Sequence, residues 1–195
     1  MDSRSEPLLL PPADRRRGPA LLDVFASMAL STPVGAVDVR RLARSLATAG
    51  GDVRLLGALL GADGRRLLWH FRARDHREVG RRLGRAGIPP VRTWLGNIRE
   101  PNPAQPANVA VEHETDPAGP VPALVGLPGG PGVEDRQTLC LVTHRVTPVR
   151  AARSLDGRHL LVLYHAPDSE SVRQAQRNSS VPGGAVWPFL LIPPA

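Results

Sequence analysis

Two stretches of this sequence are near-copies of each other, and no other feature limits the fold as strongly. DGRRLLWHFRARDHREV begins at Asp63, and DGRHLLVLYHAPDSESV begins at Asp156, 93 residues later. The same offset extends without a gap to a tryptophan in each copy, Trp94 and Trp187. Because chance would hardly keep these residues in register, we predict that the chain is a tandem duplication of two small units.

Each copy is predicted to contain the same secondary structure. In residues 53–71 and 148–165 an Asp-Gly turn separates two apolar runs, which indicates a β-hairpin. A helix with Asp75 or Asp168 as its N-cap follows, and then a strand that carries the tryptophan. A strand and a helix precede each hairpin (21–30 and 37–51, then 108–116 and 133–145). The order is β-α-β-β-α-β, which is ferredoxin-like.

We predict an α+β fold in which two tandem ferredoxin-like units form one pseudo-dimeric α+β barrel, because each unit leaves one sheet face uncovered. The expected organisation is a disordered tail (1–19), a first unit (20–98), a proline-rich linker (99–107) and a second unit (108–195). The linker is expected to be extended and to hold the halves at an effective concentration of about millimolar. Association of whole chains into a homodimer stays open.

A cytoplasmic protein without a membrane partner is expected. No run approaches the roughly 20 apolar residues that cross a bilayer, and the first residues lack the apolar core of a secretory signal. The single cysteine cannot form an internal disulfide, which agrees with a reducing compartment.

The positive charge of the chain comes from arginine alone. All 25 basic residues are arginine and the formal net charge is +7, a bias typical of a GC-rich genome. Arg77, Arg81 and Arg85 recur every four residues along one predicted helix face, which could bind nucleic acid or an acidic partner or could be an ordinary solvated surface. The scarcity of aromatic residues for base stacking disfavours nucleic acid.

The second half carries a set of short motifs. Glu112 lies in a predicted strand, and Cys140 precedes His144 by four residues. SLDGR, YHAPDSESVR and a closing Val186-Trp187 follow. This pattern resembles the small bacterial nickel-binding domain family of dimeric α+β barrels, although His165 stands where family members have glutamate. The resemblance implies a site for nickel or another divalent transition metal, with Glu112, Cys140 and His144 as its ligands.

The same residues allow other interpretations. Cys140 and His144 would project from one helix face, and with Glu112 they could hold a borderline transition ion or form an acid–base pocket lined by Tyr164, His165 and Trp187. They could equally be an ordinary core cysteine and a helix-capping histidine. The remaining histidines, His70, His76, His113 and His159, are expected at the surface or at sheet edges.

The first copy lacks all three candidate ligands. Ala47, Gly51 and Ser27 occupy the positions that correspond to Cys140, His144 and Glu112. A site built from these residues is therefore expected only in the second unit, with the first unit as a structural partner.

The hypothesis favoured by the sequence is a module that binds a small ligand or a nickel-like metal. A cofactor-independent enzyme similar to barrel monooxygenases or isomerases, with His144 or His165 as the proton acceptor, is the first alternative. An interaction protein that uses the arginine face is the second.

Overall fold

The structure, a computed structural model, describes residues 21–48, 51–88, 92–116, 134–179 and 183–194. The expected N-terminal tail lies outside the described residues. No helix of the described part of the chain is long and apolar enough to cross a membrane.

The two units have the expected order of strands and helices. The first unit consists of β1 (Leu22–Ala29), α1 (Ala36–Thr48), β2 (Arg54–Gly61), β3 (Arg66–Ala73), α2 (His76–Arg85) and β4 (Arg92–Arg99). The second consists of β5 (Val109–Glu114), α3 (Glu134–Thr143), β6 (Thr147–Ser154), β7 (His159–His165), α4 (Ser169–Ser179) and β8 (Ala185–Ile192). The prediction of two tandem ferredoxin-like units is confirmed.

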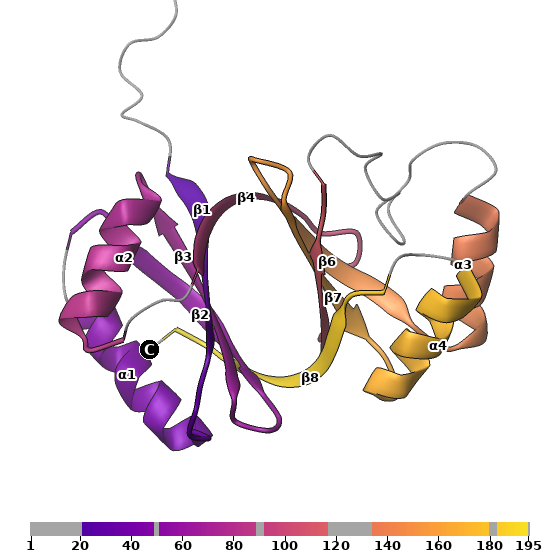
Figure 1. Ribbon diagram of the computed structural model, residues 1–195, viewed down its shortest axis with the longest axis horizontal. Helices are drawn as coiled ribbons and strands as arrows, with labels where there is room; N and C mark the ends of the chain where they lie inside the picture. Colours follow the sequence, from indigo (N-terminus) through magenta and orange to yellow (C-terminus); the bar gives the residue numbers. More distant parts are fainter. Residues whose placement is uncertain (1–20, 49–50, 89–91, 117–133, 180–182, 195) are drawn as a thin grey trace, which may run out of the picture.

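The eight strands close into one barrel in the order β1-β3-β2-β8-β5-β7-β6-β4. Two antiparallel pairings join the units: β8 of the second unit pairs with β2, and β4 of the first unit pairs with β6. In Figure 1 the strands form a ring, with α1 and α2 outside one side of it and α3 and α4 outside the other. The barrel is thus assembled from both halves of a single chain.

Successive side chains of each strand point to opposite faces of the sheet, and this divides the buried apolar residues into three clusters. One cluster lies between the first sheet and α1 and α2, and a second lies on the corresponding outer side of the second sheet. The third fills the barrel interior with residues from both units, among them Phe25, Leu68, Trp94, Leu161 and Trp187. Trp94 and Trp187, the matching tryptophans of the two units, are both buried in this third cluster. Each sheet therefore buries both faces, one under helices and one against the other unit.

The strand registers of the two units correspond closely. Val24 lies opposite Phe71, and Val109 lies opposite Tyr164 at the matching place in the second unit. A bulge interrupts the hairpin pairing between Leu55 and Gly57, and another interrupts it between Pro148 and Arg150. Common origin by duplication stays a prediction, but the two halves are built on the same pairing scheme.

The helix starts follow the predicted capping. The side chain of Asp75 accepts a hydrogen bond from the Arg77 backbone N–H at 3.0 Å. Asp168 accepts one from the Ser171 N–H at 2.7 Å. These carboxylates satisfy backbone donors that would otherwise lack partners in the first turn.

The linker differs from the expected extended tether. The Gln105 N–H donates to the Asn102 carbonyl at 3.2 Å, which closes a turn. The Asn102 side chain also donates to the Pro148 carbonyl at 2.8 Å. Proline fixes backbone φ and favours turns as well as extended chain, and the contacts with β6 select the turn.

Tyr164 provides a test of this packing. Its hydroxyl is fully buried without a hydrogen-bond partner among the described residues, whereas the matching residue of the first unit, Phe71, has no hydroxyl. We expect Tyr164→Phe to leave the free energy of unfolding unchanged or to raise it by about 1 kcal/mol in urea denaturation. The reverse change, Phe71→Tyr, should lower it by about 1–3 kcal/mol. A marked loss of stability in Tyr164→Phe would contradict this packing.

Candidate functional site

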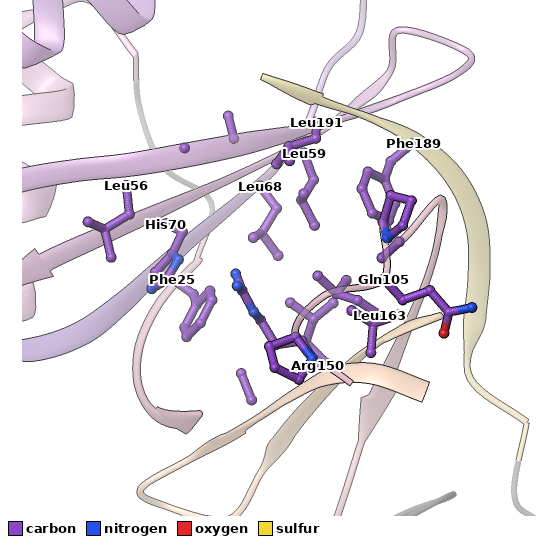
Figure 2. Close-up of a pocket in the computed structure, with 18 of the residues that line it drawn as sticks. Phe25, Leu56, Leu59, Leu68, His70, Gln105, Arg150, Leu163, Phe189 and Leu191 are labelled. Carbon is purple, nitrogen blue, oxygen red and sulfur yellow. The ribbon is translucent and has the colours of Figure 1, made fainter. Parts of the chain in front are cut away.

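The barrel contains a cavity of about 330 Å³ near one end. Most of its wall is apolar, formed by Phe25, Leu59, Leu68, Leu161, Leu163 and Phe189 from strands of both units. Figure 2 shows Phe25 and His70 on one side, Phe189 and Gln105 on the other, and Arg150 reaching between them. This volume lies at the lower end of the range for small-molecule sites.

The polar side of the wall is organised around His70. Its Nε2 lies 2.9 Å from Oδ1 of Asp23, across the pairing of β3 with β1. Its ring stacks on Phe25 with a centroid separation of 4.6 Å and an interplanar angle of 6°. Phe25 in turn stacks on Trp94 at 4.3 Å. The imidazole is therefore fixed at its edge by a carboxylate and on its face by an aromatic stack.

This hydrogen bond determines the tautomer of His70. A carboxylate only accepts hydrogen bonds, so Nε2 carries the proton and Nδ1 keeps its lone pair. Burial lowers the pKa of His70, and the hydrogen bond and negative charge of Asp23 oppose part of that shift. The side chain is only 14% exposed. At neutral pH, His70 is thus an uncharged imidazole that can accept a proton at Nδ1.

Arg150 brings a positive charge to the same place. It directly follows the bulge of β6, where it pairs with Leu163, and it lines the cavity together with His70. Its Nη2 lies 2.6 Å from Oε1 of Glu100, which begins the linker. The charge of Arg150 contributes to the lowered pKa of His70, so the two groups interact. A base and a guanidinium beside one apolar cavity can remove a proton and stabilise the anion that forms.

The linker forms part of the cavity wall. Residues 103–107 line the cavity opposite the strands, and the Pro106 carbonyl lies 2.9 Å from Nδ1 of His165 at the end of β7. The segment that joins the two units thus also restricts access to the barrel interior.

The three expected metal ligands do not meet. Glu112 accepts a hydrogen bond from Nε1 of Trp187 in the barrel at 3.1 Å, and burial raises the pKa of its carboxyl. Cys140 and His144 belong to α3 and its end, outside the sheet, where Nε2 of His144 lies 2.9 Å from the Asn178 amide. No group of three or more metal-ligating side chains occurs among the described residues. The predicted convergence is therefore wrong, because Glu112 lies on the opposite sheet face from α3.

The expected pocket-lining residues are also separated. Tyr164 is packed in the outer core of the second unit, and burial raises the pKa of its hydroxyl. Trp187 lies in the barrel beside Glu112, and His165 contacts the linker. None of the three lines the apolar cavity described above.

Two of the histidines expected at the surface or at sheet edges are shielded from solvent, His113 fully and His70 in part. His113 is 6% exposed, and burial lowers its pKa. His70 borders the cavity, although the sequence analysis assigned it no functional role. The sequence did contain a usable signal. Residues two apart on a strand share a sheet face, as Asp23 and Phe25 do on one strand and Leu68 and His70 on its neighbour. Pairing these two strands in the correct register would therefore place Asp23 and His70 on the same face.

The site also departs from the expected confinement to the second unit. Asp23 and His70 come from the first unit and Arg150 from the second. At the matching positions of the opposite units the chain has Asn108, Leu163 and Gly57. Because each of these three ionisable residues has a non-ionisable counterpart, the polar wall is present at one end of the barrel and has no equivalent at the symmetry-related place.

The arginine face of α2 lies apart from the cavity. Arg77, Arg81 and Arg85 are exposed and make no ion pair within the described chain. Arg82, between them, is buried and donates to the Val53 carbonyl. Binding of an anionic partner by this face stays a prediction.

Comparisons with known proteins support the fold. No known protein family matches the chain, and no curated protein matches its sequence significantly. A solved structure provisionally named chlorite dismutase matches 89% of this chain and 95% of its own, with a TM-score of 0.53 and 11% identity. An anthrone oxidase-like protein matches 88% of this chain and 92% of its own, with a TM-score of 0.42 and 12% identity. A provisionally named monooxygenase from Lactobacillus acidophilus matches 88% of this chain and 94% of its own, with a TM-score of 0.41 and 7% identity.

Of these three structures, the first has a TM-score above 0.5, and its likeness over most of both chains agrees with the α+β fold described above. At such low identity the likeness concerns the fold alone. Nickel binding is not shown by any of them.

The His70–Asp23 pair can be tested by titration. Asp23→Asn should lower the pKa of His70 further, because the amide can still accept a hydrogen bond but removes the negative charge that favours the imidazolium. The measurement is an NMR titration of the imidazole signal that His70→Gln removes. Asp52→Asn removes a carboxylate that pairs with Arg74 at 3.2 Å and should leave the midpoint unchanged. An unshifted midpoint in Asp23→Asn would show that the pair does not form.

Proposed function

We propose that this chain is a small-molecule enzyme in which His70 removes a proton from an apolar substrate bound inside the barrel. The observation that carries this proposal is the His70–Asp23 hydrogen bond at the wall of an apolar cavity. It leaves Nδ1 as the only proton acceptor of the imidazole. The proposal follows the enzyme alternative derived from the sequence, but with a different base from His144 or His165.

Each polar residue has a distinct part in this chemistry. Asp23 orients the imidazole and stabilises the imidazolium formed when Nδ1 takes the proton. Arg150 stabilises the negative charge left on the substrate. Return of the proton to another atom of the substrate would complete an isomerisation and would regenerate neutral His70. This sequence of steps needs no cofactor and no second reactant.

The apolar wall supports the same assignment. Aliphatic and aromatic side chains, together with linker residues 103–107, make the wall of the cavity mainly apolar. In such surroundings the charges of Arg150 and Asp23 act more strongly than in bulk water. The lowered pKa of His70 keeps the base unprotonated at neutral pH.

The proposal can be tested with 5-nitrobenzisoxazole, a planar and uncharged probe. A base removes its ring C–H proton, the electron pair of that bond forms a nitrile, and the N–O bond breaks to release a coloured phenolate. Wild type should accelerate this reaction, and His70→Ala should lower kcat/KM by about 100-fold or more. With the wild type, kcat/KM should rise with pH through the lowered pKa of His70 and be constant at neutral pH.

The control is His144→Ala, which removes the histidine outside the barrel that the sequence had suggested as a base. It should retain wild-type activity. Equal losses in the two variants, or a His70→Ala protein as active as wild type while folded by circular dichroism, would refute the role of His70.

A further inference from the structure

We infer that the substrate is an amphipathic organic acid, whose carboxylate binds in a cationic vestibule beside the cavity while its apolar part fills the barrel. This inference rests on the proposed function, because it names the class of molecule that the same site accepts. It derives from a second hollow, which shares lining residues with the first.

The vestibule adjoins the apolar cavity at three shared residues. Leu56, His70 and Arg150 line both hollows. The vestibule is wider, with a volume of about 940 Å³, and its wall is polar where that of the cavity is apolar. Its charged side chains are Asp23, Arg72, Arg99, Glu100 and Arg150. A molecule that spans the two hollows must therefore have one apolar end and one polar end.

The charges of the vestibule favour an anion. The Asp23 carboxylate already accepts from His70 and lies 3.6 Å from Nη2 of Arg72. Glu100 pairs with Arg150 at 2.6 Å. Arg99 is exposed and has no acidic partner among the described residues. Three guanidinium groups face two carboxylates, so the wall has one uncompensated positive charge.

The geometry of the guanidinium group favours a carboxylate as the bound anion. Arginine presents parallel N–H donors that match the two oxygens of a carboxylate. Arg99 can supply such a pair without breaking an existing ion pair. Arg72, which is 47% exposed and only loosely paired, can turn toward the same ligand.

The order of groups along the two hollows adds a second expectation about the substrate. The vestibule holds the acid group, His70 lies at the junction, and the cavity holds the apolar part. The proton that His70 removes is therefore on an atom between the carboxylate and the apolar body. Arg150, also at the junction, lies where the negative charge would develop.

The test compares two probes of nearly equal shape, 2-naphthoate and the uncharged 2-naphthamide, by calorimetry or fluorescence quenching. Wild type should bind 2-naphthoate about fivefold to tenfold more tightly than 2-naphthamide. Arg99→Gln should remove most of this preference by weakening 2-naphthoate binding alone. Added salt should reduce the preference as well, because the vestibule is open to solvent.

Arg44→Gln is the matched control, since it removes one exposed arginine from α1, outside the barrel. It should not change the preference for 2-naphthoate. Equal binding of the two probes by wild type, or an equal effect of Arg99→Gln and Arg44→Gln, would overturn the inference. Either result would leave the base role of His70 to be judged separately, since 5-nitrobenzisoxazole is uncharged.

Discussion

Closure of the barrel by the β2–β8 and β4–β6 pairings is the constraint on which the rest of the structure depends. A ferredoxin-like unit covers one face of its sheet with helices, so its other face must find a partner. Pairing of the last strand of each unit with the hairpin of the other unit satisfies the open sheet edges of both units and buries the inner faces against each other. Phe25 and Trp94 of one unit thereby share a core with Leu161 and Trp187 of the other.

The same closure creates the cavity. Because its wall comes from both units, its chemistry depends on positions where the two halves differ. His70 has Leu163 as its counterpart and Arg150 has Gly57, so one end of a nearly symmetric barrel acquires a base and a cation. The linker then covers part of this end. A single chain with two similar units can carry different residues at matching positions, which two identical subunits cannot do.

The candidate site could be predicted far less well than the fold. Cys140 and His144 are spaced correctly for one helix face, and the error lay in adding Glu112, whose side chain points away from that helix into the barrel. Side chains on a strand alternate between two faces, so a shift of one residue decides whether a group meets the helices or the barrel. Asp23 and His70 are 47 residues apart, and no local spacing rule connects them.

The sequence by itself determined the two βαββαβ units, the turns at Asp63 and Asp156, and the helix starts, because these depend on periodicity and on contacts between neighbours in the chain. Only the tertiary structure decided which sheet faces meet, where the cavity lies and which polar groups share it. The physical reason is that burial, strand register and charge proximity are properties of residues brought together by barrel closure. Asp23, His70 and Arg150 form one site only after both units have contributed their strands.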